Sequence, residues 1–167
     1  WNQTASGLEA LAFYADGSLS ITESTDENGK VSREYKNKTS QVVLTEKIIE
    51  EGVRLRTYFV FDDIGRLTHV IPPKTSASLS TTLPVTITID ILSKECYSYR
   101  YDERNRVAVK NIPGAGAQYI VYDLWDRVVL TQHANQRTKN KWSFNKFDAL
   151  NRVVLTGEIV LAGDNAV

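Results

Sequence analysis

Carboxylate and guanidinium side chains recur at one fixed spacing in this sequence, and they are its first candidates for chemistry. In four places an Asp is followed four positions later by an Arg, and two of these Asp residues stand beside a second acid, in the pairs Asp62-Asp63 and Asp102-Glu103. Glycoside hydrolysis requires two carboxylates roughly 5 to 10 Å apart across a sugar. Neighbouring side chains in a tight turn diverge, however, and a catalytic group need occur only once. The repetition therefore favours a structural role.

Other side chains that could do chemistry are few. The sequence has one cysteine, Cys96, and two histidines, His69 and His133, and none of them stands in a recognisable nucleophile or base motif. One thiol excludes an internal disulfide framework, and the three residues together do not supply the Cys-rich or multi-histidine ligand set of a structural metal site. We interpret Cys96 as a small buried hydrophobe and His69 as a sheet residue. The sequence predicts no enzyme activity, no metal and no cofactor.

Six turn motifs position the recurrent Asp and Arg residues. Each begins with Asp or Asn, continues through two variable residues to a turn-tolerant residue, and ends on a long polar side chain. The motifs occupy residues 26–30, 37–41, 62–66, 102–106, 123–127 and 148–152. An Asp or Asn that opens a type I turn accepts backbone N–H groups through its side chain, and the fourth position then needs positive φ. Each motif predicts a β-hairpin turn.

The fourth position decides how well each motif fits. Gly, Asn and Asp tolerate the left-handed region and occupy it in five motifs, whereas Ser40 departs from the pattern, so residues 37–41 are expected to form a different or degenerate turn. An aromatic residue precedes the Asp in four motifs. The residues expected to define the repeat are Asp26, Gly29, Asp62, Gly65, Arg66, Tyr101, Asp102, Asn105, Arg106, Tyr122, Asp123, Asp126, Arg127, Phe147, Asp148, Asn151 and Arg152. We expect the Asp residues to cap turns and the Arg stems to cover aromatic faces or pair with carboxylates.

Strand patterns flank the turns and predict an all-β fold. Residues 85–91 alternate apolar and polar side chains, as a half-buried strand does. Residues 42–51 could be a helix, but they begin with the Val-Val-Leu-Thr run that follows later turns, and we predict a strand. The Pro- and Ser-rich segment 72–82 is predicted to be an exposed insertion loop, and 135–141 a polar connection. Consecutive antiparallel hairpins should form a twisted sheet within one domain, residues 1–167.

Composition excludes several classes of partner. The 167 residues carry 20 Lys and Arg against 20 Asp and Glu, so the chain has no basic footprint for nucleic acid. No apolar run approaches the length of a membrane helix, and the start at Trp1 lacks the pattern of a signal peptide. Since the sequence contains no Met, we expect that it is cut from a longer polypeptide.

The turn motifs and their flanks carry a family resemblance. The strings are YFVFDDIGRL (58–67), YSYRYDERNRV (97–107), YIVYDLWDRVVLTQ (119–132) and FNKFDALNRVVLTG (144–157). They resemble the tyrosine–aspartate (YD) repeats of RHS proteins, and residues 97–116 are especially similar to RHS-repeat proteins of Bacteroidetes. The sequence departs from the pattern where Asn or Asp replaces the turn Gly, and the first two motifs lack the aromatic residue. Residues 1–24 match least and could be a capping strand pair or a degenerate copy.

The resemblance implies a structural function. RHS repeats form secreted or cell-surface shells of spiralling hairpins that enclose or present a C-terminal effector, such as a toxin. The implied partners are then the rest of the same long polypeptide, its neighbouring repeats and its effector. Some relatives carry an autoproteolytic Asp site at the end of the shell, but no matching motif is found here, so no cleavage activity is carried over.

Two further expectations concern surfaces. Trp125 occupies the third position of a turn, where side chains usually face solvent, so the alternative function is a surface module that binds carbohydrate or a partner protein through exposed aromatic rings. A sheet cut from a longer wall would also have unpaired edge strands. We therefore expect the isolated chain to associate through its edges or to swap a terminal hairpin.

Overall fold

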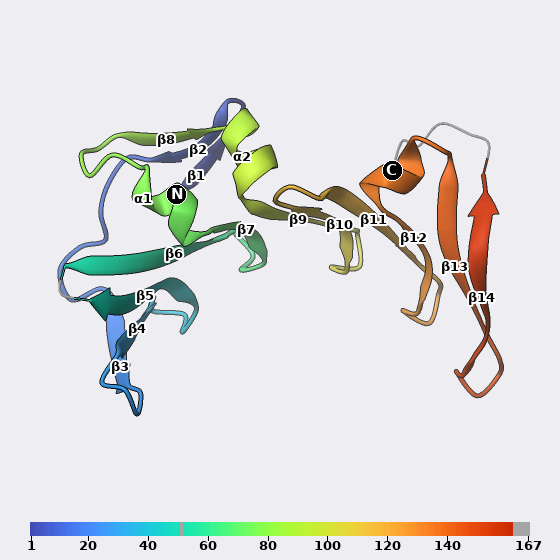
Figure 1. The fold of residues 1–167 in the computed structure, drawn as a ribbon, viewed down its shortest axis with the longest axis horizontal. Coiled ribbons are helices and arrows are strands. Elements are labelled where there is room, and N and C mark those ends of the chain that lie inside the picture. Colours follow the sequence, from blue (N-terminus) through green and yellow to red (C-terminus); the bar gives the residue numbers. More distant parts are fainter. Residues whose placement is uncertain (51, 162–167) are drawn as a thin grey trace. The chain divides into compact units, whose positions relative to one another are not determined.

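The computed structural model describes residues 1–50 and 52–161, and just over half of them belong to β-strands. The strands form two sheets, one of eleven strands and one of three (Figure 1). The all-β prediction is confirmed. The chain divides into two compact units, Trp1–Ser98 and Tyr99–Val167. The single domain predicted for residues 1–167 stays a prediction beside this division.

The larger sheet follows the order of the chain and is antiparallel at each described pairing. Its order is β14-β13-β12-β11-β10-β9-β7-β6-β5-β4-β3. The first unit supplies β3 (Ser20–Thr25), β4 (Val31–Lys36), β5 (Val42–Glu50), β6 (Val53–Phe61) and β7 (Leu67–Ile71). Strand β9 (Tyr97–Tyr101) follows, and the second unit continues with β10 (Val107–Ile112), β11 (Gly116–Tyr122), β12 (Val128–Gln132), β13 (Lys141–Phe147) and β14 (Val153–Val160). Each turn motif joins two sequential neighbours.

The antiparallel order fixes the end of the sheet at which each turn lies. In the first unit, the turns 37–41 and 62–66 close β4-β5 and β6-β7 at one end, whereas the turn 26–30 closes β3-β4 at the opposite end. In the second unit the turns 102–106, 123–127 and 148–152 all lie at one end (Figure 1). Motif 26–30 is therefore out of phase with the motif that follows it.

The smaller sheet covers part of the first unit. Strands β1 (Asn2–Thr4), β2 (Gly7–Ala10) and β8 (Val85–Thr88) form it, and with helix α2 (Ile89–Glu95) they pack over β6 and β7 (Figure 1). The buried core consists of Leu8, Val60, Ile71, Ile87, Leu92 and Cys96. Residues 1–24 thus divide between the two sheets, since β1 and β2 belong to the covering layer and β3 to the repeat sheet.

The prediction of a strand over residues 85–91 is wrong beyond Thr88. There β8 ends and α2 begins, because Thr88 acts as a helix cap: its hydroxyl oxygen accepts the backbone N–H of Ile91 at 3.4 Å. The ion pair between Asp90 and Lys94, 2.7 Å long, adds an i,i+4 contact along the helix. Apolar and polar residues continue to alternate after Thr88, so the alternation alone placed the end of the predicted strand three residues too late.

The predicted loops also contain short helices. Segment 72–82 was expected to be an exposed insertion, but α1 (Pro73–Ala77) forms within it, buries Thr75 and donates a hydrogen bond from Ser76 Oγ to the Arg56 carbonyl at 2.6 Å. The polar connection 135–141 includes most of α3 (Ala134–Arg137). The strand predicted for residues 42–51 is confirmed as β5 through Glu50, and residue 51 lies outside the described residues.

Candidate functional site

Each Asp-to-Arg motif forms a turn in which one carboxylate satisfies several donors. In the turn 102–106, Asp102 Oδ1 accepts the backbone N–H groups of Arg104 and Arg106, both at 2.9 Å. Its other oxygen, Oδ2, accepts Arg106 Nε at 2.7 Å, and the backbone N–H of Asp102 donates to the Arg106 carbonyl. Asn105 adopts φ 61°. The turn is thus closed by the two residues that define the motif.

The same geometry recurs in the other Asp-to-Arg turns. The Nε to Oδ2 distance is 2.7 Å at Arg66–Asp62, Arg127–Asp123 and Arg152–Asp148. The fourth residue has positive φ in each of these turns, at Gly65, Asp126 and Asn151. Four copies with one set of bonds identify a repeated fold element.

The turn 37–41 forms although its fourth residue is a serine. Ser40 adopts φ 62°, so the prediction that it departs from the pattern is wrong. Asn37 Oδ1 accepts the backbone N–H groups of Thr39 and Gln41, and Asn37 Nδ2 donates to Gln41 Oε1 at 2.9 Å. These bonds hold the left-handed residue in place. At the opposite end of the sheet, Asp26 accepts from Asn28 and Lys30 in the same way.

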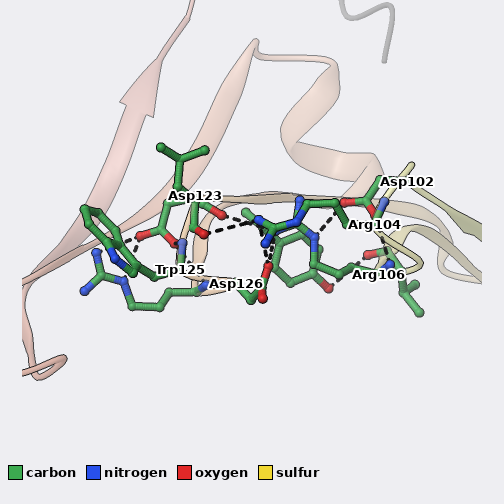
Figure 2. A network of polar contacts seen from close by, with 10 residues as sticks. Asp102, Arg104, Arg106, Asp123, Trp125 and Asp126 are labelled. Atoms are coloured by element: carbon green, nitrogen blue, oxygen red, sulfur yellow. Dashed lines mark hydrogen bonds and ion pairs between the residues drawn. The ribbon is translucent and has the colours of Figure 1, made fainter.

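The residue that ends a motif can also join its turn to the next one. Arg106 Nη1 donates to Asp126 Oδ1 at 2.6 Å and to the carbonyl of Asp123 at 3.1 Å, both in the following turn (Figure 2). Arg104, from the same turn as Arg106, also pairs with Asp126, at 3.1 Å, and donates to the Leu124 carbonyl. Turn 102–106 is therefore bound to turn 123–127 through several hydrogen bonds and ion pairs.

Two more links repeat this relationship. Arg127 Nη1 donates to Asn151 Oδ1 at 2.8 Å, and in the first unit Gln41 Nε2 donates to the Gly65 carbonyl at 3.0 Å. In each case the fifth residue of one motif binds the fourth residue of the next motif. We call this series of links the turn ladder. The ladder joins sequential hairpins through side chains, in addition to the backbone pairing of their strands.

The aromatic residue before the Asp takes part in two links of the turn ladder. Arg106 Cζ lies 4.6 Å from the ring centroid of Tyr122, and Arg127 Cζ lies 4.6 Å from that of Phe147. Both rings stand directly before the Asp of the following turn. Arg127 also lies 4.9 Å from the ring of Trp125 in its own turn. A guanidinium over an aromatic face gains cation–π attraction and covers apolar surface with its stem.

The last described turn differs from its neighbours in the exposure of its arginine. The side chains of Arg106 and Arg127 are 21% and 20% exposed, whereas that of Arg152 is 72% exposed. Arg152 keeps the bond to its own Asp148. Arg106 and Arg127 are each covered by the aromatic ring and the fourth residue of the turn that follows. No described residue covers Arg152 in this way.

The turn carboxylates are held ionised. The hydrogen bond from the Arg106 side chain lowers the pKa of Asp102, and the hydrogen bonds from the Arg152 backbone and side chain lower that of Asp148. Partial burial opposes ionisation of Asp62 and Asp123, but the hydrogen bonds from the arginines outweigh it, so their pKa values are also lowered. A proton donor in catalysis needs the opposite shift.

The remaining chemical candidates are buried or isolated. Cys96 is fully buried, and burial raises the pKa of its thiol to about 11. His69 lies in β7, where burial lowers the pKa of its imidazole, and its Nδ1 has no hydrogen-bond partner among the described residues. His133 caps α3. Within residues 1–50 and 52–161, no three metal-ligating side chains form a cluster, and no helix is long and apolar enough to cross a membrane.

The aromatic residues differ sharply in exposure. Trp125 is 73% exposed at the tip of its turn, while Trp142 is 6% exposed inside the sheet. In the first unit, a cavity of about 540 Å³ has six aromatic residues in its lining, which falls within the size range of small-molecule sites. These aromatic residues are Trp1, Phe13, Tyr14, Tyr58, Phe59 and Phe61. The tip of Trp125 and this cavity are the exposed aromatic surfaces that a ligand could use.

A row of alternating charges crosses the first unit, and sequence reasoning missed it. Glu23 faces Arg33, Arg33 faces Glu46, and Glu46 faces Arg56 in the strand pairings of β3 to β6. Glu46 is 2% exposed and accepts Arg56 Nε at 2.9 Å, with Arg33 and Arg54 at 3.5 and 3.6 Å. The sequence shows charged residues within the predicted strands, but only the strand register shows that these residues face one another.

The fold has a counterpart among solved structures. A chain in a structure of the Photorhabdus luminescens Tc holotoxin pore, with a mutation in TccC3, matches 82% of this chain with a TM-score of 0.53 and 12% sequence identity. The match spans only 6% of that longer chain. No family model matches the sequence, and no curated protein matches it. At this identity the likeness shows a shared fold alone.

Proposed function

We propose that this chain is a scaffold segment of a secreted or cell-surface RHS/YD-repeat protein, where it forms part of the wall of a β-shell that encloses or presents a C-terminal effector. The observation that carries the proposal is the turn ladder. Arg106 and Arg127 each bind the turn that follows, so one hairpin fixes the position of the next. Such links suit a wall that must keep its curvature over many hairpins.

The likeness in fold to part of the Tc holotoxin pore structure supports this proposal. The matched chain is far longer than this one. A shell of which this segment formed one part of the wall would also need a much longer chain. The partners in this function are the remainder of the same polypeptide, its neighbouring repeats and its effector. Nucleic acid has no part in it, because the net formal charge is zero.

The proposed role is not enzymatic. The turn carboxylates are ionised and each is bound by its own arginine, as in the pair Asp123–Arg127 at 2.7 Å. The thiol of Cys96, with its raised pKa, stays protonated at neutral pH and is a weak nucleophile. Both observations support a structural use of residues that elsewhere serve catalysis.

The scaffold proposal is tested on the full-length protein by electron microscopy and limited proteolysis. We expect residues 1–161 to lie in a continuous hollow wall, and a protease to release no stable piece that ends near its boundaries. Release of an intact fragment that melts at the same temperature as in the full-length protein would contradict the proposal, because an independent module does not depend on neighbouring hairpins.

The alternative function, binding of carbohydrate or a partner protein, is favoured by the exposure of Trp125. One face of its ring contacts Arg127 and the side chain is 73% exposed. The matched control is Leu150, which occupies the same position of the next turn and is 72% exposed. If Trp125→Ala abolishes binding to an oligosaccharide panel while Leu150→Ala preserves it, the binding function is supported. If the parent chain binds no member of the panel, the binding function is contradicted.

A further inference from the structure

We propose that the outer edge of β14 is a docking site for one further β-hairpin of the same repeat, and that Arg152 selects this hairpin. The inference rests on the proposed scaffold function and states which kind of strand the edge accepts. It concerns two properties of the second unit, the open edge of its last strand and the exposed side chain of its last turn arginine.

The edge of β14 has the character of an unfilled pairing site. Among the described residues, β14 pairs with β13 alone, and all eight of its residues are exposed. The exposed side chains include Val153, Val154 and Leu155, at 52%, 62% and 50%. Unpaired backbone groups beside apolar side chains form a template for another strand. This observation indicates a strand but not which strand.

Arg152 identifies the strand. Arg106 and Arg127 share two kinds of contact with the following hairpin, one with the aromatic ring before its Asp and one with the side chain at its fourth turn position. Arg152 has the same bond to its own Asp148 as they have to theirs, yet its side chain is more than three times as exposed. The hairpin that would cover it must therefore supply that ring and that side chain.

The occupant is thus an antiparallel strand that ends in an aromatic residue and leads into Asp-x-x-Asn or Asp-x-x-Asp. Its backbone would pair with β14, its ring would lie under the Arg152 guanidinium, and its Asn or Asp oxygen would accept a guanidinium N–H. The opposite edge strand, β3, ends at Thr25 and leads to Gly29 at the fourth position. It offers neither group, so β3 of a second copy does not fit.

The test supplies a matching hairpin within the chain. Residues 133–160, which contain α3, β13, the last turn and β14, are inserted a second time directly after Val160. Hydrogen exchange of the backbone amides of β14 is then measured by NMR in the parent and the duplicated chain. We expect the outward amides of the original β14 to exchange at least about tenfold more slowly in the duplicated chain.

Two variants of the duplicated chain test the selection by Arg152. In one, the original Arg152→Ala removes the guanidinium. In the other, the inserted copy carries Phe147→Thr and Asn151→Gly, the residue types that β3 offers. We expect each variant to lose most of the added protection, while the β12-β13 amides stay protected and show that the sheet is folded. In the parent chain, Arg152→Ala should leave the fast exchange of the outward β14 amides unchanged.

Three results would overturn the inference. Unchanged fast exchange in the duplicated chain would mean that the edge accepts no hairpin, and equal protection in all duplicated chains would mean that it accepts any strand. Protection in the parent chain that rises with protein concentration would assign the edge to a second copy. Each differs from a failure of the scaffold proposal, which would appear as the release of an independently stable fragment from the full-length protein.

Discussion

The guanidinium of Arg127, which ends one turn, lies 4.6 Å from the ring centroid of Phe147, which precedes the next turn. The two residues are 20 positions apart in the sequence, and the same relationship links Arg106 to Tyr122. It explains why the motif joins an aromatic residue, an Asp and an Arg: the Asp and Arg close their own turn, and the ring receives the arginine of the preceding turn.

The first prediction measures this link. Arg127→Ala should lower the free energy of unfolding by about 1 to 2 kcal/mol, because it removes the cation–π contact with Phe147 and the hydrogen bond to Asn151 in the next turn, together with the ion pair to Asp123 in its own turn. Arg152→Ala is the matched control, since Arg152 has the same position in its motif but is 72% exposed. We expect it to cost less than about 0.5 kcal/mol. Urea denaturation followed by circular dichroism gives both values.

The variant Arg127→Lys refines the comparison. Lysine keeps the charge but lacks the planar fork that binds Asp123 and Asn151 together, so most of the loss should remain. Equal losses of unfolding free energy for Arg127→Ala and Arg152→Ala would show that the contact with the following hairpin does not stabilise the chain. The turn ladder would then be present in the structure without contributing to stability.

The second prediction concerns the left-handed turn positions. Gly29→Val should destabilise the chain by about 1 to 2 kcal/mol, because a β-branched residue resists the φ of 77° while a Cβ there would have no neighbour within 4 Å. Gly65→Val should cost more, since its Cβ would also approach Gln41 Nε2 to 3.1 Å and disturb the bond to the Gly65 carbonyl. Thermal melts compare the two, and equal costs would show that the Gln41 link adds no stability.

The third prediction is a loss of stability in acid. The folded pKa of the turn carboxylates is lowered, so the unfolded chain takes up protons first as the pH falls. Their contribution is therefore complete above about pH 5, where Asp is ionised in the unfolded chain as well, and it is lost progressively as the pH falls through and below the ordinary Asp pKa of about 3.9. Glu46 and Glu158 act in the same direction because their pKa values are also lowered. Urea midpoints at several pH values between 7 and 2.5 measure the loss.

The variant Asp102→Asn supplies the control for the acid prediction. An amide cannot take up the proton, so the variant should lose less stability than the parent between pH 5 and pH 3, although it starts from a lower value at pH 7. Parallel curves for the two chains would show that Asp102 does not carry a lowered pKa.

The local rules of turn chemistry explain what the sequence could reveal. Asp, Asn and Gly at fixed offsets predicted the turns and the hairpins around them, because those preferences act within five residues. Ser40 was misjudged for a reason of the same kind: its own preference was counted, whereas the bonds of Asn37 and Gln41 decide its conformation. Thr88 likewise ends a strand by capping a helix that the alternating pattern concealed.

Contacts between residues that are distant in the sequence could not be predicted from the motifs. The role of Arg106 was predicted as pairing or stacking, but its partners Asp126 and Tyr122 follow from hairpin register, which the motif does not state. The charge row depends on register in the same way, since Arg33 and Glu46 face each other only when β4 and β5 are aligned. A separation of 13 to 20 positions is set by loop lengths and strand lengths, and no local preference encodes it.

The fourth prediction concerns Cys96. Its side chain is fully buried in the core and the pKa of its thiol is about 11, so the reactive thiolate is scarce at neutral pH. We expect a thiol reagent such as iodoacetamide to modify the native chain at least about a hundredfold more slowly than the chain unfolded in urea. Modification of the native chain at the rate of a free thiol would show that the core of the first unit opens readily.

The last prediction concerns Glu46, the buried carboxylate of the charge row. It is 2% exposed and accepts a hydrogen bond from Arg56 at 2.9 Å, with Arg33 and Arg54 nearby. Glu46→Gln keeps the size of the side chain but removes the charge that these arginines share, so the free energy of unfolding should fall by about 1.5 to 3 kcal/mol. Glu23→Gln is the control, because Glu23 pairs with Arg33 at 2.7 Å in the same row but is 51% exposed, and it should cost less than about 1 kcal/mol. Chemical denaturation of the two variants measures the difference. Equal costs would mean that burial does not strengthen the row, and a gain in stability for Glu46→Gln would mean that desolvation of the carboxylate outweighs its pairing.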